Sequence, residues 1–367
     1  MQLKVVKFGG SSLSDTEHFM RVASIIKADP TRRYVVASAP GKRTDDDQKV
    51  TDMLYTCYNM IKNREDITDY YQKIVERYTG IISGLNLNFD ITGELEYIKS
   101  AMMARSGRDF AASRGEYLNS LILAKYLGFD FIDAENVIFF KDNGSFDEEK
   151  TNEAMKAELK KHKNAVIPGF YGSMPNGTIK TFTRGGSDIT GSIVARASNA
   201  DLYENWTDVS GFLMADPRIV KDPLPISTVT YRELRELSYM GAGVLHEDSI
   251  FPVQKEGITI NIRNTNHPED EGTLIVPNMY TDANEHLITG VAGKKGFSVI
   301  NIEKNRMGGE FGFAARVFKC LDNYAIHTEH LASGIDTMSH IVSTKELNSK
   351  MDELVTELHR VTDADNI

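Results

Sequence analysis

The sequence of 367 residues holds 42 lysines and arginines against 52 aspartates and glutamates, which gives a formal net charge of −10. This balance argues against a protein that adheres broadly to DNA or to anionic lipid, although a local basic pocket remains compatible with it. With 41% hydrophobic residues the chain can bury a sizeable core, and it is longer than one typical domain. We therefore expect a soluble globular protein of two domains.

The two cysteines, Cys57 and Cys320, stand far apart and without metal-ligand spacing, so neither a disulfide framework nor a structural zinc site is expected. The N-terminus MQLKVVKFGG contains a short strand-like run in place of the apolar core of a signal peptide. No stretch approaches the roughly 18 consecutive apolar residues of a membrane helix. We expect a cytoplasmic protein with neither a membrane nor nucleic acid among its partners.

The N-terminal part alternates strands and helices. Residues 3–8 form an apolar strand, a Gly-Gly-Ser-Ser turn follows, an amphipathic helix begins at about Asp15, and residues 34–39 form a second apolar strand. This order predicts a βαβ unit. One helix and two short buried strands are indicated further along, at residues 116–127, 129–132 and 165–167. Such alternation predicts an α/β fold with a parallel sheet.

The pattern changes after a strand at 259–262. A polar loop and a strand at 273–276 come next, and residues 277–286 are interpreted as a connection. A strand, a helix, two strands and a helix are then predicted, at residues 297–302, 311–321, 325–329, 337–343 and 344–361. This βαββα order is one strand short of a ferredoxin-like split βαβ unit. We therefore place one domain at 1–280 and a second at 287–367.

The strongest local motif is Lys7-Phe8-Gly9-Gly10-Ser11-Ser12, where a strand ends and a helix is about to begin. Two glycines let backbone N–H groups approach an anion, the helix terminus adds partial positive charge, and Lys7 supplies a mobile cation. The motif therefore suits a triphosphate, although Gly-Gly could also make only a tight turn. Neither a P-loop nor a Rossmann glycine fingerprint is present.

A second glycine motif, Thr183-Arg184-Gly185-Gly186-Ser187-Asp188, also precedes a predicted helix. Arg184 could clamp a carboxylate through two parallel hydrogen bonds. Asp188 would be a costly negative charge in an anion site unless it orients cations or metal. The alternative is that Arg184 and Asp188, four residues apart, form an ion pair on a helix surface.

A third motif, Trp206-Thr-Asp-Val-Ser-Gly-Phe-Leu-Met-Ala-Asp-Pro-Arg218, follows a strand predicted at 201–205. It offers a hydroxyl, carboxylates and an arginine at the carboxyl end of a strand, where open α/β sheets bind ligands. The alternative is a surface β-turn in which Asp-Pro starts a bend.

Together, these three motifs resemble those of the aspartate kinase branch of the amino-acid kinase family. That family's K-F-G-G-[ST]-S, R-G-G-S-D and W-T-D-V-x-G-x-x-x-x-D-P-R stand intact at residues 7–12, 184–188 and 206–218. Shorter matches extend the resemblance over essentially the whole chain, at Val35 to Gly41 with Thr44, at Ser113 to Glu116, and at Gly241 to His246. The resemblance implies the amino-acid kinase fold, a three-layer αβα sandwich with a mainly parallel open sheet.

The resemblance also implies a role for each matched residue. The transferring phosphoryl group would be held by Lys7, Gly9, Gly10 and Ser11, with Asp188 orienting Lys7. Aspartate would be bound by Ser38, Thr44, Glu116, Arg184, Gly185, Gly186 and Ser187. Within that set, Arg184 would take the α-carboxylate and Glu116 the α-ammonium. The nucleotide would be lined by Thr207, Asp208, Leu213, Arg218, Gly243 and Val244. Family members often carry lysine where Gly243 stands, so one cationic contact to ATP is expected to be absent.

The implied reaction phosphorylates the side chain of L-aspartate with ATP, giving 4-phospho-L-aspartate and ADP, the first step of lysine, threonine and methionine biosynthesis. An aspartate side chain has a pKa of about 3.9, so the nucleophile is already ionised and needs no general base. The site must instead supply cations, N–H groups and Mg²⁺, which would arrive mainly with ATP.

The region from about Leu287 resembles an ACT domain, the amino-acid-binding module of feedback-regulated aspartate kinases. Gly308 to Phe313 would hold the effector, with lysine expected and threonine as the alternative. The same βαββα order is also a common scaffold with no ligand. The sequence stops before the last strand and a second ACT copy, so we expect an incomplete region here, and a homodimer or larger assembly for the full-length protein.

Two other functions stay open. A kinase of glutamate or a related acid would share the phosphate loops but should lack the 206–218 motif. A non-enzymatic amino-acid sensor could keep the fold, although the joint presence of Lys7, Arg184, Asp188 and Asp208 argues against it.

Overall fold

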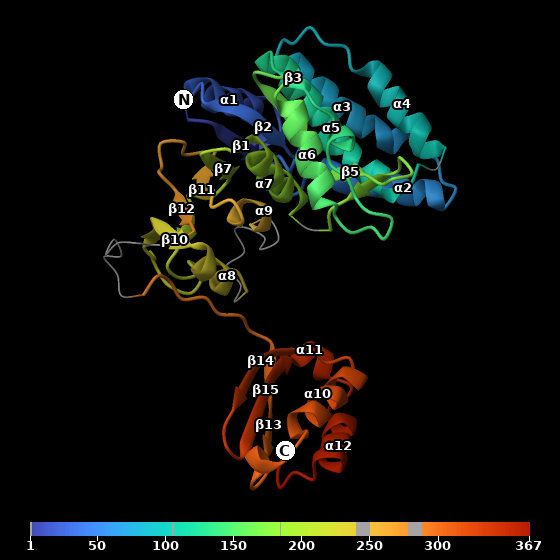
Figure 1. The fold of residues 1–367 in the computed structure, drawn as a ribbon. Helices are drawn as coiled ribbons and strands as arrows, with labels where there is room; N and C mark the ends of the chain where they lie inside the picture. Colours follow the sequence, from blue (N-terminus) through green and yellow to red (C-terminus); the bar gives the residue numbers. More distant parts are fainter. Residues whose placement is uncertain (1, 105, 184, 240–249, 278–287) are drawn as a thin grey trace. The chain divides into compact units, whose positions relative to one another are not determined.

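The computed structural model describes residues 2–104, 106–183, 185–239, 250–277 and 288–367. The chain divides into two compact units, one ending at Ala292 and the other beginning at Gly293 (Figure 1). Each unit has its own hydrophobic core. Among the described residues, no helix is both long and apolar enough to cross a membrane.

The first unit is built on an eight-stranded sheet. Its strands are β1 (Lys4–Phe8), β2 (Arg32–Ala37), β3 (Asp130–Phe131), β4 (Ala165–Pro168), β7 (Leu202–Thr207), β10 (Thr228–Thr230), β11 (Thr259–Asn264) and β12 (Thr273–Val276). Their order across the sheet is β10-β12-β11-β7-β1-β2-β4-β3. The strands from β11 to β3 run parallel, whereas β12 is antiparallel to β11. The mainly parallel open sheet predicted from the sequence is confirmed.

Helices cover both faces of this sheet (Figure 1). One core joins the sheet to α1 (Thr16–Ala28), α2 (Val50–Lys62), α3 (Thr68–Gly84), α4 (Thr92–Met103) and α5 (Arg108–Leu127). The other joins it to α6 (Glu148–Leu159), α7 (Gly186–Ser198), α8 (Tyr231–Tyr239) and α9 (Phe251–Gln254). Because side chains alternate along a strand, Val6 and Phe8 enter the first core and Val5 the second.

Short elements complete this unit. They are the 3-10 helices η1 (Ser11–Leu13) and η2 (Ala134–Asn136), the hairpin of β5 (Tyr171–Ser173) with β6 (Ile179–Thr181), and the pair of β8 (Phe212–Leu213) with β9 (Pro225–Ile226). The helix expected from about Asp15 begins directly after it, because the Asp15 carboxylate caps the helix by accepting from the His18 backbone N–H at 3.1 Å. The helix predicted at 116–127 begins earlier, at Arg108, so the Ser113 to Glu116 motif lies inside α5.

The second unit consists of β13 (Phe297–Glu303), η4 (Met307–Gly309), α10 (Phe313–Asn323), β14 (Thr328–Ser333), β15 (Thr337–Ser343), α11 (Thr344–Leu347) and α12 (Met351–Thr362). Its strands form an antiparallel sheet in the order β13-β15-β14. The predicted βαββα order is present, but the single helix expected at 344–361 is two helices separated by Asn348 to Lys350. Near the C-terminus, Asn366 forms an isolated antiparallel bridge with Glu303 of β13.

Candidate active site

A cavity of about 600 Å³ opens where three parallel strands end. The strands β1, β2 and β7 finish at Phe8, Ala37 and Thr207, and the segments that follow them line the cavity. Its wall is made of Gly9, Gly10, Ser11, Ser38, Ala39, Pro40, Gly41, Lys42, Arg43, Thr44, Asp45, Lys49, Thr51, Glu116, Thr207 and Asp208. The carboxyl ends of parallel strands are the usual ligand-binding edge of an open α/β sheet.

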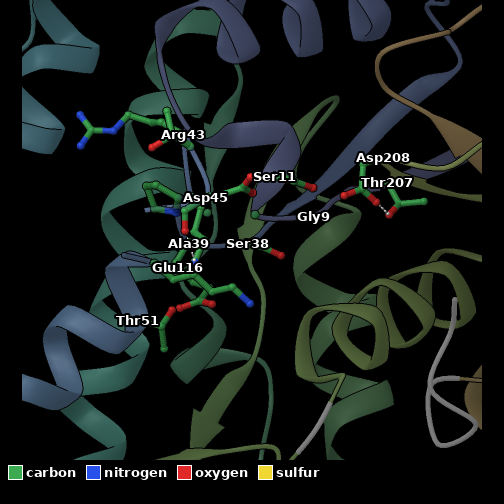
Figure 2. A pocket seen from close by; sticks show the side chains of 16 residues that line it. Gly9, Ser11, Ser38, Ala39, Arg43, Asp45, Thr51, Glu116, Thr207 and Asp208 are labelled. Atoms are coloured by element: carbon green, nitrogen blue, oxygen red, sulfur yellow. Dashed lines mark hydrogen bonds between the residues drawn. The ribbon is translucent and has the colours of Figure 1, made fainter. Parts of the chain in front are cut away.

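The cavity has two sides that meet at the Gly9 turn. Figure 2 shows Thr207 and Asp208 on one side of Gly9, and Ser38, Glu116 and Thr51 on the other. The sequence placed the first pair beside a nucleotide and Ser38 and Glu116 beside aspartate. The structure therefore brings residues of both predicted subsites to one cavity, with the phosphate motif between them.

The turn itself is made of backbone packed on backbone. The Gly41 N–H donates to the Gly10 carbonyl at 2.8 Å. A Cβ on Gly10 would lie 2.9 Å from the Ala39 carbonyl oxygen, and one on Gly41 would lie 2.6 Å from the Gly10 carbonyl carbon. Neither position has room for a side chain, so the sequence needs glycine at both, and the chain can present backbone groups to a ligand.

Lys7 lies beneath this turn and is paired with Asp188. Lys7 Nζ is 2.6 Å from Asp188 Oδ1, and a Cβ on Gly9 would lie 3.7 Å from the same ammonium. Asp188 stands in the first turn of α7, which starts from Gly185 in the left-handed conformation at φ 56°. Lys7 and Asp188, which the sequence analysis expected to be partners, are therefore in direct contact although 181 positions separate them in the chain.

Asn205 also contacts Asp188, and the sequence analysis did not find it. Its Nδ2 donates to Asp188 Oδ1 at 2.9 Å. Asn205 precedes the Trp206 motif by one residue, and the pairing of β1 with β7 places it directly beside Lys7. The sequence held no signal for this contact, because strand register depends on tertiary pairing.

Glu116 is a buried acid on the side of the cavity that also holds Ser38 and Thr51. Burial raises the pKa of Glu116 to about 8, while backbone hydrogen bonds at Glu116 and Ala39 and the charge of Arg114 oppose that rise. Among the described residues, its Oε2 atom has no hydrogen-bond partner. A buried acceptor without a partner costs free energy, which a bound donor such as an ammonium group would recover.

The loop that carries Thr44 is anchored from α3 by a residue that the sequence analysis also missed. Arg77 donates to the Gly41 carbonyl at 2.5 Å and to Asp47 Oδ2 at 2.7 Å. Arg43 donates to the same Asp47 oxygen at 2.8 Å. Hydrogen bonds from Arg43 and Arg77 hold the pKa of Asp47 well below its usual range, despite partial burial. These hydrogen bonds fix the loop whose residues Lys42, Arg43 and Thr44 line the cavity.

Other predicted site residues lie away from this cavity or outside the described residues. Leu213 is half-exposed on β8, and the Arg218 side chain is 86% exposed and paired with Asp216 at 2.6 Å. Gly185, Gly186 and Ser187 form the start of α7 and do not line the cavity. Arg184, Gly243 and Val244 lie outside the described residues.

Carboxylates are sparse around the cavity. Within the described part of the chain, no three His, Cys, Asp or Glu side chains are grouped as a metal site. On the other side of Gly9 from Glu116, the Thr207 hydroxyl donates to Asp208 Oδ1 at 3.1 Å. One carboxylate with a neighbouring hydroxyl fits Mg²⁺ that is carried largely by substrate phosphates, and does not fit a fully protein-made cage.

Comparison with known proteins decides the family. Residues 2–264 match the amino acid kinase family. Aspartokinase 3 of Bacillus subtilis is 36% identical over 374 residues, which cover 96% of this chain and 80% of that protein. The chain belongs to the amino acid kinase family, in its aspartokinase branch.

Solved aspartokinases also share the fold. The aspartate kinase of Clostridium acetobutylicum is 50% identical, with a TM-score of 0.92 over 100% of this chain and 84% of that chain. Escherichia coli aspartokinase III, solved with aspartate and ADP, is 24% identical, with a TM-score of 0.75 over 99% of this chain and 85% of its own. The amino acid kinase fold predicted from the motifs is confirmed, and the protein is a kinase.

Proposed function

We propose that this kinase transfers the γ-phosphoryl group of ATP to the side-chain carboxylate of L-aspartate, giving 4-phospho-L-aspartate and ADP. The observation that carries the proposal is the position of Glu116, a buried acid with an unpartnered oxygen, in the same cavity as the Gly9–Gly10 turn. This arrangement offers one place for an amino-acid ammonium and another for phosphate. The 50% identity to an aspartate kinase supports the choice of substrate.

In this proposal the protein acts by positioning and charge. The aspartate carboxylate is ionised at neutral pH, so the barrier lies in bringing an anion to a polyanion. Lys7 and the backbone of Gly9, Gly10 and Ser11 would stabilise charge on the transferring group, and Asp188 would keep the Lys7 ammonium directed. Glu116 would bind the α-ammonium after losing its proton.

The remaining substrate contacts are proposed from the family motif. Ser38 and Thr44 line the cavity and would complete the aspartate pocket. Arg184 would bind the α-carboxylate, together with Gly185, Gly186 and Ser187 at the start of α7. Thr207 and Asp208 would hold the nucleotide and its Mg²⁺, which neutralises charge on the phosphate oxygens. By the family resemblance, Leu213, Arg218, Gly243 and Val244 would contact other parts of ATP.

The test of this function is substrate-dependent turnover. ADP release would be followed with Mg-ATP and L-aspartate, L-glutamate or no amino acid, and acyl phosphate would be trapped as a hydroxamate with hydroxylamine. With Mg-ATP present, we expect hydroxamate in the reaction with L-aspartate and none with L-glutamate or without an amino acid. Hydroxamate with glutamate instead would indicate another amino-acid kinase, and ATP binding without turnover would indicate a sensor.

We also propose that the second unit regulates this activity as an ACT-like region, in a homodimer or larger assembly in the cytoplasm. The turn from Gly308 to Phe313 would bind an amino-acid effector. We expect this effector to be lysine, with threonine as the alternative, because both are end products of the pathway that 4-phospho-L-aspartate enters. Its C. acetobutylicum relative is an allosteric enzyme. Initial rates with each amino acid added would show inhibition by the true effector and none by the other.

A further inference from the structure

We propose that Asn205 is a positioning residue for phosphoryl transfer, which holds the Asp188 carboxylate so that Lys7 can meet the phosphoryl group. This role rests on the proposed kinase function. Its basis is a three-residue contact in which Lys7 Nζ and Asn205 Nδ2 both reach Asp188 Oδ1, at 2.6 Å and 2.9 Å. No sequence motif of the chain points to it.

The backbone fixes this contact. Lys7 and Asn205 are register partners on the parallel strands β1 and β7, so their side chains leave the sheet on the same face. Both residues are buried, at 8% and 3% exposure. Asp188 approaches from the first turn of α7, which packs on that face. The amide can therefore reach the carboxylate without any loop having to close.

The chemistry explains why a second donor is useful. When ATP binds, Lys7 must share its ammonium protons between Asp188 and phosphate oxygens. A partly buried carboxylate that loses a donor is destabilised and can rotate away. Asn205 supplies a donor that carries no charge, so it holds Asp188 without competing for the phosphate or adding to the local charge.

Asn205 is the uncharged donor to the Asp188 carboxylate among the described residues. Among the described residues, Lys7 and Asn205 are the two partners of the Asp188 side chain. The Tyr203 hydroxyl contacts the Asp188 backbone carbonyl at 3.3 Å, and burial keeps the pKa of Tyr203 well above its usual value. Ile262, beside Asn205 on β11, is apolar. No other described titratable group contacts the carboxylate.

The first test is Asn205→Leu, compared with Asn261→Leu. Asn261 is a buried asparagine of the neighbouring strand whose register partner is Glu204, so it faces the opposite side of the sheet. Losing one hydrogen bond to a charged group should lower kcat of Asn205→Leu about ten- to a hundredfold. The KM values for ATP and aspartate should stay close to those of the parent, and Asn261→Leu should keep the parent kcat.

The second test is Asn205→Asp, which remains informative if Asn205→Leu folds poorly. Two carboxyl groups this close should share one proton. While they share it, the carboxyl introduced at position 205 can still donate to Asp188, and the local charge equals that of the parent. Above the pKa of that pair, a second negative charge would repel the phosphates. We expect kcat of this variant to fall reversibly as pH rises, while parent kcat does not.

The outcomes separate this role from the reaction itself. An active parent with an unchanged kcat in Asn205→Leu, or a pH profile of Asn205→Asp parallel to that of the parent, would overturn the positioning role alone. A parent without aspartate-dependent turnover would overturn the proposed function and this role together.

Discussion

Gly41 and Gly10 are in backbone contact, and this contact joins the loop after β2 to the turn after β1. The Gly41 N–H donates to the Gly10 carbonyl at 2.8 Å. The loop after β2 and the turn after β1 therefore form one wall of the cavity. Movement of either segment would change the distance between the two proposed subsites.

Gly41→Ala should damage both the fold and the reaction. Its Cβ would lie within 3 Å of three backbone atoms of Gly10 and Ser11, so the turn must shift. We expect a loss of about 1 to 3 kcal/mol in the free energy of unfolding and a lower kcat/KM. Gly80→Ala is the matched control, because nothing lies within 4 Å of its Cβ and alanine favours the helix there. Thermal unfolding and initial rates would compare them, and equal effects would contradict the contact.

Glu116 should make aspartate binding depend on pH. Its pKa of about 8 means that the carboxyl is mostly protonated at pH 7, whereas an ammonium ligand needs it ionised. The KM for aspartate should fall about tenfold per pH unit as pH rises toward 8, and then level off. In Glu116→Gln the KM should be higher and this dependence lost. A parent KM that stays flat from pH 6 to 8 would contradict the proposed role.

Arg77 should matter for substrate binding although it lies outside the cavity. Replacement by methionine removes both the Gly41 and the Asp47 hydrogen bonds from a nearly buried side chain. We expect a loss of about 3 to 5 kcal/mol in the free energy of unfolding and a raised KM for aspartate. Lys161→Met breaks an exposed pair with Glu158 and should change stability by less than about 0.5 kcal/mol. Similar values for both variants would show that the loop is not anchored by Arg77.

His340 should make the second unit less stable in acid. Burial lowers the pKa of His340, and its Nε2 atom has no hydrogen-bond partner among the described residues. The unfolded chain therefore binds a proton more readily than the folded chain does. The contribution of neutral His340 to the free energy of unfolding is complete above about pH 6.5 and is lost as the pH falls below that value. The slope should be at most about 1.4 kcal/mol per pH unit. Chemical denaturation of the full chain at pH 5 and 7 should show it, and His340→Gln should reduce it.

Local sequence patterns were enough to predict several elements. The apolar runs of β1, β2 and β4 and the amphipathic pattern of α1 are local signals, and the structure has the elements they indicate. The start of α5 was missed, because that helix is buried on most sides and shows little amphipathic pattern. The break between α11 and α12 spans Asn348 to Lys350, and the side chains of Asn348 and Ser349 can compete with helical hydrogen bonds.

In the candidate site too, local sequence patterns identified some residues and missed others. Motif residues such as Lys7, Gly10, Asp188 and Asp208 were found from local chemistry or family resemblance. Asn205 and Arg77 were not, because their importance comes from strand register and from a contact 30 residues away in the chain. In one sequence, residues that are expected to contact a ligand are easier to recognise than the residues that hold them in place.

The most direct test of the central claim is to find which carboxyl group of aspartate carries the phosphate. Product formed from L-aspartate and Mg-ATP would be reduced with borohydride, which converts an acyl phosphate to an alcohol, and the amino acid would be identified by chromatography. Phosphorylation of the side chain predicts homoserine. Recovery of 3-amino-4-hydroxybutanoate, or of unchanged aspartate despite aspartate-dependent ADP release, would contradict the proposed reaction.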